Sequence, residues 1–176
     1  HGIGRRQRQM CIRDRLMYES FFKILKGVPL TLEVVFISTL LGFGLAIIVA
    51  LMRISDNKLY SVPAYSFIYL IRGTPLLLQL YFVYYGISQF SFVRESFLWP
   101  ILREPFWCGI ITLTISTGAY SAEIIRGGIQ SVSQGYIESG KALGLGRISL
   151  FFRIVMPITI RQALPAYGNE LILMVK

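Results

Sequence analysis

Histidine and cysteine are nearly absent from this sequence of 176 residues, which holds one His and two Cys. The histidine is His1, and Cys11 and Cys108 form no Cys-x-x-Cys pair. Because no histidine follows residue 1, we expect no metal site and no nucleophile–base pair that needs one in the rest of the chain. A Gly-x-x-x-x-Gly-Lys-Ser/Thr phosphate loop is also missing. We expect no catalytic residue, no metal and no cofactor in this chain.

Charged residues are scarce as well. They make up 15% of the chain, against about 25% in a typical soluble domain, whereas 54% of residues are hydrophobic. The mean hydropathy is +0.58. This composition favours an integral membrane protein of one domain.

The positive charge is concentrated at the start of the chain. Residues 1–15 carry five Arg and one Asp, so about half of the net charge of +9 lies there. A basic arm can bind nucleic acid or anionic lipid. Residues 1–16, however, resemble translated sequencing-adapter sequence, so we expect them to be non-native and Met17 to be the start. We therefore expect no nucleic-acid partner, and we assign residues 17–176 to the membrane domain.

The first apolar run predicts a membrane-spanning helix. Val34–Met52 contains 19 residues without a charge, close to the thickness of a bilayer at 1.5 Å per residue. We expect this helix to start near Leu30, after a short amphipathic segment at Glu19–Lys26 that lies at the interface. Glu33 is either a solvated helix end or part of a pathway.

The next apolar stretch is too long for one span. Leu59–Val93 is interrupted only by Arg72, and Gly73-Thr74-Pro75 supplies a break. Thr74 is a good N-cap and proline suits a first helical turn. We therefore expect an interfacial or kinked segment at Leu59–Ile71, with tyrosines at headgroup level, and a second span at about Pro75–Ser91. Arg72 then lies at the membrane surface. The alternative is one helix kinked at the proline, with Arg72 facing a cavity.

Two further spans follow. Pro105–Ala122 has no charge and predicts a helix that extends to about Ile125, preceded by a neutral loop at 94–104 with Trp99 and Trp107 at the membrane boundary. Ile154–Lys176 holds two prolines, an Arg and a Glu, so we expect an irregular fourth helix that lines a wet path. Because the 53–58 turn and the 126–153 region carry excess Lys and Arg, both are expected to face the cytoplasm.

A short polar stretch bounded by glycines lies between the last two apolar regions. Residues 135–146 read Gly-Tyr-Ile-Glu-Ser-Gly-Lys-Ala-Leu-Gly-Leu-Gly. Gly135 can cap a helix, with Glu138 three residues later, and Gly144 suits the left-handed position that ends one. Two turns are too few to be stable alone, so this helix needs a surface to dock on.

This stretch resembles the coupling-helix, or EAA, loop of permease subunits from ATP-binding-cassette importers. Glu138 is followed by two small residues and, six positions on, by Gly144, although Ser139 and Gly140 replace the usual alanines. The resemblance extends from about residue 27 to residue 176. Its most specific motifs are Arg72-Gly73-Thr74-Pro75-Leu76-Leu77, Gly118-Ala119-Tyr120-Ser121-Ala122-Glu123, Arg126-Gly127-Gly128 and Leu164-Pro165, which are similar to the polar amino-acid branch.

The resemblance implies an all-α type I permease bundle in the bacterial cytoplasmic membrane. About four membrane-spanning helices and a cytoplasmic coupling helix are present, and a C-terminal helix is expected to be missing. The chain would translocate polar amino acids without hydrolysing ATP itself. Implied partners are separate ATPase subunits, a second or related permease, an extracytoplasmic solute-binding protein, the amino-acid substrate and membrane lipid. Which amino acid is carried, and whether the permease pair is identical or mixed, stays open.

The resemblance and the polar residues within spans together nominate three sets of residues. The set expected to dock on the ATPase is Gly135, Glu138, Ser139, Gly140, Ala142, Leu143 and Gly144. Because polar groups at membrane depth tend to be functional, the expected substrate path is Gln79, Tyr120, Asn169 and Glu170. An inner gate is expected from Glu123 paired with Arg72 or Arg126. The alternative function is a membrane scaffold or sensor that does not transport.

Overall fold

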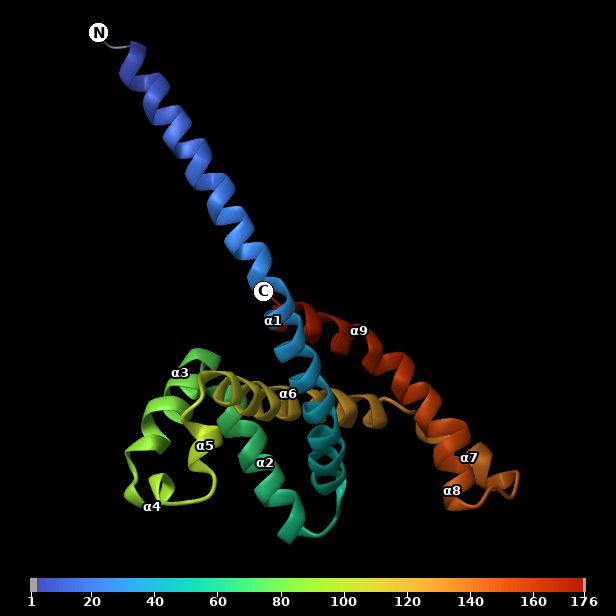
Figure 1. Ribbon diagram of the computed structural model, residues 1–176. Coiled ribbons are helices and arrows are strands. Elements are labelled where there is room, and N and C mark those ends of the chain that lie inside the picture. Colours follow the sequence, from blue (N-terminus) through green and yellow to red (C-terminus); the bar gives the residue numbers. More distant parts are fainter. Residues whose placement is uncertain (1–2, 176) are drawn as a thin grey trace. The chain divides into compact units, whose positions relative to one another are not determined.

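Figure 1 shows a computed structural model of the chain, which describes the backbone of residues 3–175 and the side chains of residues 25–175. Over these residues the chain forms helices and no strand. Its contacts divide it into two units, His1–Val34 and Val35–Lys176. The first unit contains the leading part of helix α1 (Ile3–Ile54), and the second contains the rest of α1 and all later helices.

Helix α1 begins earlier than the sequence predicts. It runs through Pro29 instead of starting near Leu30, and its apolar part is Leu25–Ile54. A proline removes one backbone hydrogen bond, but the neighbouring turns stay helical, and the Thr31 hydroxyl donates to the Gly27 carbonyl at 3.1 Å. The predicted amphipathic segment at Glu19–Lys26 falls largely outside the residues whose side chains are described. The non-native origin of residues 1–16 stays a prediction.

Three helices of the described chain are long and apolar enough to cross a membrane. They are Leu25–Ile54, α6 (Pro105–Gln130) and the continuous helical segment Arg147–Val175. Helix α2 (Lys58–Gly73) and the segment Leu76–Gln89 pass the same test together, but they are bent by 105°. The predicted architecture of about four spans is confirmed if this bent pair counts as one span.

The remaining elements are short. The segment after the bend comprises α3 (Leu76–Tyr81), a π-helical turn, η1 (Phe82–Gly86), and a 3₁₀ turn, η2 (Ile87–Gln89). Helices α4 (Ser91–Arg94) and α5 (Trp99–Leu102) then lead to α6. After α6 come α7 (Gln134–Ala142), α8 (Arg147–Leu150), the π-helical turn η3 (Phe151–Val155) and α9 (Met156–Val175).

The break after α2 occurs at the predicted place but by a different mechanism. Thr74 does not cap the following helix; it is the extended residue that closes α2, with φ −112° and ψ 139°. Its hydroxyl donates to the carbonyls of Leu70 and Ile71 at 3.0 and 3.2 Å. A residue before proline is biased towards extended conformations, which explains why Thr74 ends one helix while Pro75 precedes the next.

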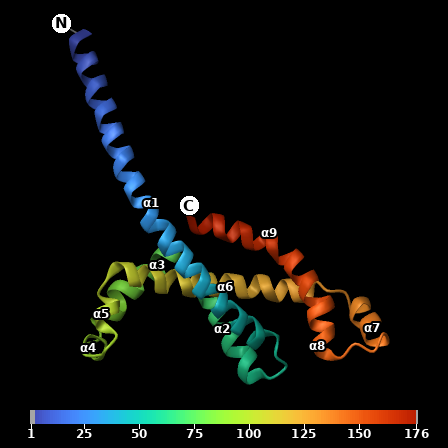
Figure 2. The ribbon, with the colours of Figure 1, turned by 45° about the vertical axis from the view of Figure 1, so that its right-hand side comes forward.

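Helix α6 is the central element of the second unit. It contacts α2, α3, α5 and α9, and Figures 1 and 2 show it running past both α2 and α9. Helices α1 and α6 approach each other closely because each has a glycine at the contact. A Cβ on Gly42 would lie 2.9 Å from the Thr117 Cβ, and a Cβ on Gly118 would lie 2.6 Å from a methyl of Leu45.

The hydrophobic core lies where α1, α2 and α6 meet. It consists of small and branched side chains that are almost fully buried, namely Ala46, Val49, Ala50, Ala64, Ile68 and Ala122. Elsewhere many large apolar side chains are exposed along the helices. Exposed apolar surface of this extent is expected for a protein that lies in lipid, where apolar side chains face the acyl chains.

Candidate functional site

Helix α7 is the helix predicted from the glycine-bounded stretch. It starts two residues earlier than expected: Ser133 is the extended N-cap residue, with φ −66° and ψ 145°, and Gly135 lies inside the first turn. The prediction that Gly135 caps the helix is therefore wrong, because Ser133 already takes the extended conformation of an N-cap.

The end of α7 agrees with the prediction. Gly144 has φ +76°, the only positive φ among the described residues. Its N–H donates to the Lys141 carbonyl at 2.9 Å, and the Leu145 N–H donates to the Gly140 carbonyl at 3.1 Å. This pair of bonds is the Schellman motif, in which a glycine takes the left-handed position after a helix.

The residues of α7 that were predicted to dock on the ATPase face two directions. Glu138, Ser139, Ala142 and Leu143 are exposed, whereas Gly140 is buried. A Cβ on Gly140 would lie 2.7 Å from the Ile154 Cδ1 and 2.9 Å from the Leu150 Cδ1. Gly140 is therefore small because α7 packs on α8 and η3 of the same chain. A docking role for the exposed residues stays a prediction.

A polar groove lies between the end of α1, one face of α2 and the middle of α6. Its volume is about 340 Å³, and it is lined by Arg53, Tyr65, Ile68, Tyr69, Arg72, Gly73, Tyr120 and Glu123. The α2 residues among them are spaced by three or four positions and so share one face of the helix. The groove combines two guanidinium groups, one carboxylate and three phenol rings.

The two arginines of the groove are placed over aromatic rings. The Arg53 guanidinium lies 4.9 Å from the centre of the Tyr65 ring, and that of Arg72 lies 5.2 Å from the centre of the Tyr120 ring. Arg53 also donates to the Ser61 hydroxyl at 3.3 Å. Cation–π contacts of this kind hold a guanidinium in place while leaving N–H donors free for an anionic group.

The carboxylate of the groove is paired along its own helix. Arg126 Nε donates to both oxygens of Glu123 at 3.0 Å, and the Arg126 guanidinium also bonds Gln130. Of the three predicted gate residues, Arg126 therefore pairs with Glu123, whereas Arg72 lines the same groove. Because Glu123 and Arg126 belong to one helix, a link from Glu123 to another element needs Arg72 on α2 or Arg53 on α1, which line the same groove.

The four predicted substrate residues do not share one cavity. Tyr120 lines the polar groove, and Gln79 lines a separate, mainly apolar cavity of about 430 Å³ between α2, α3 and α6. On α9, Asn169 is exposed and Glu170 is half-buried. Three residues of the groove were not predicted from the sequence, namely Arg53, Tyr65 and Tyr69. The spacing of residues 65, 69 and 72 places them on one helix face and was the available signal for the α2 residues.

Gln79 is a structural residue at the helix break. Its amide group donates to the Ile71 carbonyl at 2.7 Å, to the Thr74 carbonyl at 3.0 Å and to the Thr74 hydroxyl at 2.9 Å. These carbonyls end α2, where no further helical N–H follows. The amide nitrogen of Gln79 thus takes the place of the backbone donor that Pro75 lacks.

No group of three His, Cys, Asp or Glu residues that could hold a metal ion occurs in the described part of the chain. The described chain combines membrane-length helices, a polar groove and a short loop helix that packs on α8 and η3.

Comparison with known proteins identifies the family. Residues 42–176 match the family described as "Binding-protein-dependent transport system inner membrane component". The chain belongs to this family, and the permease class predicted from the sequence is confirmed.

Named relatives are similar over most of this chain. It is 53% identical to the nopaline transport system permease protein NocM of Agrobacterium fabrum, covering 92% of this chain and 68% of that protein. It is 51% identical to the octopine transport system permease protein OccM of Rhizobium radiobacter, covering 91% and 65%. It is 40% identical to the histidine/lysine/arginine/ornithine transport system permease protein HisM of Escherichia coli, covering 84% and 63%. The chain thus spans about two thirds of the length of these relatives.

A solved structure confirms the fold. The chain matches a protein described as "Crystal structure of an amino acid ABC transporter with histidines" with a TM-score of 0.71 and 35% sequence identity. The match covers 88% of this chain and 72% of that chain. The predicted all-α permease fold is therefore shown.

The tight contact of Gly140 with the side chains of Ile154 and Leu150 leads to a first prediction. Gly140→Val should lift α7 from α8 and η3, because overpacking a tight contact costs about 1–3 kcal/mol. The opened loop should be cut faster by trypsin after Lys141, by about tenfold for each 1.4 kcal/mol of destabilisation. Gly140→Ala should change little, since the methyl ends of Ile154 and Leu150 can rotate.

The matched control for this prediction is Ser139→Val on the exposed side of α7. The double variant Gly140→Val/Ile154→Ala should recover slow cleavage, because the smaller side chain leaves room for the valine. Equal cleavage of Gly140→Val and Ser139→Val would show that α7 does not depend on the Gly140 contact.

The hydrogen bonds of Gln79 generate a second prediction. Gln79→Glu keeps the size of the side chain but removes its N–H donors, so the carbonyls at the end of α2 lose a partner. The Ile71 carbonyl keeps the Thr74 hydroxyl as a donor, so the loss is that of ordinary hydrogen bonds, about 0.5–1.5 kcal/mol each. The melting temperature without substrate should therefore fall for Gln79→Glu and Gln79→Leu alike. Gln89→Glu, at an exposed position, is the control. Unchanged stability with weakened substrate binding would instead make Gln79 a substrate residue.

Proposed function

We propose that this chain forms the membrane-spanning part of an ATP-driven importer of polar amino acids. It would cross the bacterial cytoplasmic membrane several times. The names of its relatives support this substrate class, since HisM is named for histidine, lysine, arginine and ornithine. The polar groove supports it as well, because a zwitterion needs donors for its carboxylate and an acceptor for its ammonium group.

The geometry of α7 is the observation that carries the proposal. One side of α7 exposes Glu138, Ser139, Ala142 and Leu143, and the other side rests on η3 through Gly140. Because η3 continues directly into α9, a displacement of α7 by a bound partner would be passed to a membrane-spanning helix. We propose that the partner is a separate ATPase subunit that hydrolyses the ATP.

The mechanical connection from α7 continues from α9 to α6 through a second tight contact. A Cβ on Gly128 would lie 3.0 Å from the Thr159 Cγ2 and 3.1 Å from the Thr159 carbonyl oxygen. Packing this close has little freedom to slide, so α9 and α6 should move together. Since α6 carries Tyr120 and Glu123, motion of α7 would change the polar groove.

The groove suggests how a substrate and a gate are arranged. We propose that Tyr120, Asn169 and Glu170 contact the amino acid on its path, with Gln79 supporting the helix break beside it. Arg72 from α2 and the Glu123–Arg126 pair from α6 would form the inner gate. A solute-binding protein would deliver the substrate, and a second or related permease would complete the path.

The coupling assignment is tested by a charge reversal on α7. In proteoliposomes that contain the permease, its ATPase and its binding protein, one polar amino acid should stimulate ATP hydrolysis. Glu138→Lys should reduce that stimulation about tenfold or more, a loss of about 1.4 kcal/mol of coupling. Lys58→Ala, at the exposed start of α2, serves as the control.

The outcomes of this experiment separate the two parts of the proposal. If Glu138→Lys hydrolyses ATP in response to substrate as the parent does, α7 is not the coupling element. If the complex hydrolyses ATP but none of the polar amino acids changes the rate, the substrate class is wrong. If no ATPase binds, the scaffold reading replaces the transporter.

The gate assignment is tested by neutralising its carboxylate. Glu123→Gln removes the charge that pairs with Arg126 and faces Arg72, so the closed state should be destabilised. Charge-assisted hydrogen bonds contribute about 1.5–3 kcal/mol, and substrate uptake should fall at least about tenfold while basal ATP hydrolysis rises. Arg103→Gln, whose partner Glu104 lies 3.9 Å away outside the groove, is the control. Parent-like uptake by Glu123→Gln would remove the gate.

A further inference from the structure

The segment that joins the bent helix pair to α6 displays large apolar side chains to the outside. We call residues 90–107 the aromatic loop. Phe97 has 87% of its surface exposed and Phe92 has 70%. The other exposed apolar side chains of the loop are Phe90, Leu98, Ile101 and Trp107. In a loop that faces water, such apolar side chains pack inward, and the exposed positions are mostly polar.

The aromatic loop is nevertheless ordered by its own hydrogen bonds. Arg94 Nε donates to the Ser88 carbonyl at 2.6 Å, and the Ser96 hydroxyl donates to the Val93 carbonyl at 2.8 Å. The Cys108 thiol donates to the Leu102 carbonyl at 3.1 Å, which ties α5 to the first turn of α6. The hydrogen-bonded backbone therefore keeps the aromatic side chains on the outer surface of the loop.

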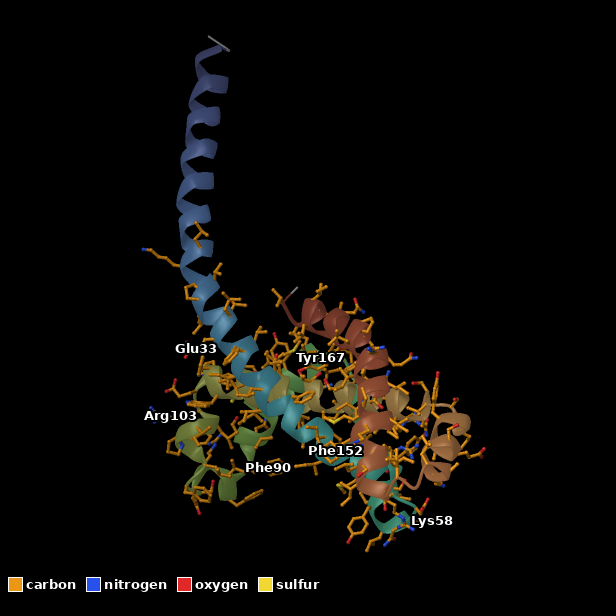
Figure 3. The ribbon with its side chains drawn as sticks, turned by 90° about the vertical axis from the view of Figure 1, so that its right-hand side faces the viewer. Glu33, Lys58, Phe90, Arg103, Phe152 and Tyr167 are labelled. Atoms are coloured by element: carbon orange, nitrogen blue, oxygen red, sulfur yellow. The ribbon has the colours of Figure 1, made fainter. Side chains whose placement is uncertain are left out.

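Only a small part of the loop packs inward. Val93 is buried, with 8% of its surface exposed, and the Arg94 guanidinium lies 5.9 Å from the centre of the Trp99 ring. Figure 3 labels Phe90 and Arg103 on this part of the chain, and both side chains are more than half exposed. The loop therefore has an apolar outer surface that no described residue covers.

The position of the loop along the chain identifies what covers that surface. It directly follows the bent pair Lys58–Gly73 and Leu76–Gln89, which together are apolar enough to cross a membrane, and it ends inside the first turn of α6, which is apolar enough by itself. The loop must therefore lie at a face of the bilayer. Its four charges, Arg94, Glu95, Arg103 and Glu104, sum to zero, so attraction to anionic lipid is not the cause.

We propose that the aromatic loop lies in the boundary between headgroups and acyl chains of the outer leaflet, with Phe92, Phe97 and Trp107 inserted among zwitterionic lipids. Aromatic side chains are enriched at this depth, and short amphipathic segments bind there by burying apolar area. The loop holds the bent helix pair and the start of α6 at one depth. Motions driven from the cytoplasmic side would then turn the helices about this end.

A photocrosslinker placed at Phe97 identifies the neighbour directly. The complete permease, assembled with its partners in its native membrane, carries benzoylphenylalanine at residue 97 and is irradiated. The adducts are identified by mass spectrometry. The matched control is residue 143, because Leu143 is similarly exposed, at 80%, but belongs to α7 on the proposed cytoplasmic side.

The proposal expects a phospholipid adduct at residue 97 and none at residue 143. The adduct should persist in 1 M salt, about the concentration at which the Debye length falls to 3 Å, and when the binding protein is added. An adduct with the binding protein or with a second permease at residue 97 would overturn it, as would the absence of any lipid adduct there.

Tryptophan fluorescence gives an independent test, because both tryptophans of the chain, Trp99 and Trp107, lie in the loop. In nanodiscs of phosphatidylcholine, bromine atoms near the headgroup end of the acyl chains should quench this fluorescence more strongly than bromine near the bilayer centre. Quenching by neither lipid, or equal quenching by an aqueous quencher with and without the bilayer, would contradict the proposed depth.

Discussion

The rest of the structure depends on one constraint: backbone polar groups that lie away from water must find partners within the chain. Regular helices meet this demand without help, which is why the described chain is helical nearly throughout. Where Pro75 interrupts the pattern, the carbonyls of Ile71 and Thr74 receive the amide of Gln79 instead. The Gln79 side chain thus supplies hydrogen bonds at the 105° bend, where a backbone donor is missing.

Close packing at glycines joins the helices of the second unit, residues 35–176. Gly42 and Gly118 bring α1 against α6, Gly128 brings α6 against α9, and Gly140 brings α7 against η3. Since a Cβ at each of these positions would lie 3.0 Å or less from a neighbouring atom, the helices approach closely there and have little room for sliding. A partner bound to α7 could thus influence the polar groove on α6 without touching it.

Much of the fold was predictable from local patterns. The break at Gly73–Pro75, the polar turn before Lys58 and the left-handed Gly144 follow from residues that act on their immediate neighbours. The groove was only partly predictable. Arg72, Tyr120 and Glu123 stood out as polar groups near spans, but Arg53 and Tyr65 looked like a turn residue and a headgroup anchor. Gln79 stood out as polar, yet its partners are backbone carbonyls eight and five residues away, which polarity alone does not reveal.

The sequence by itself determined the class of the molecule, its long apolar helices, and the helix ends marked by Pro75 and Gly144. Hydropathy, proline and glycine act over a few residues, so their effect can be read along the chain. Only the tertiary structure decided which polar groups meet and which way small residues face. Gly140 is buried while Ser139 beside it is exposed, and Arg53 shares a groove with Tyr120. Such pairings depend on how helices distant in sequence pack against α6, and no local pattern carries that information.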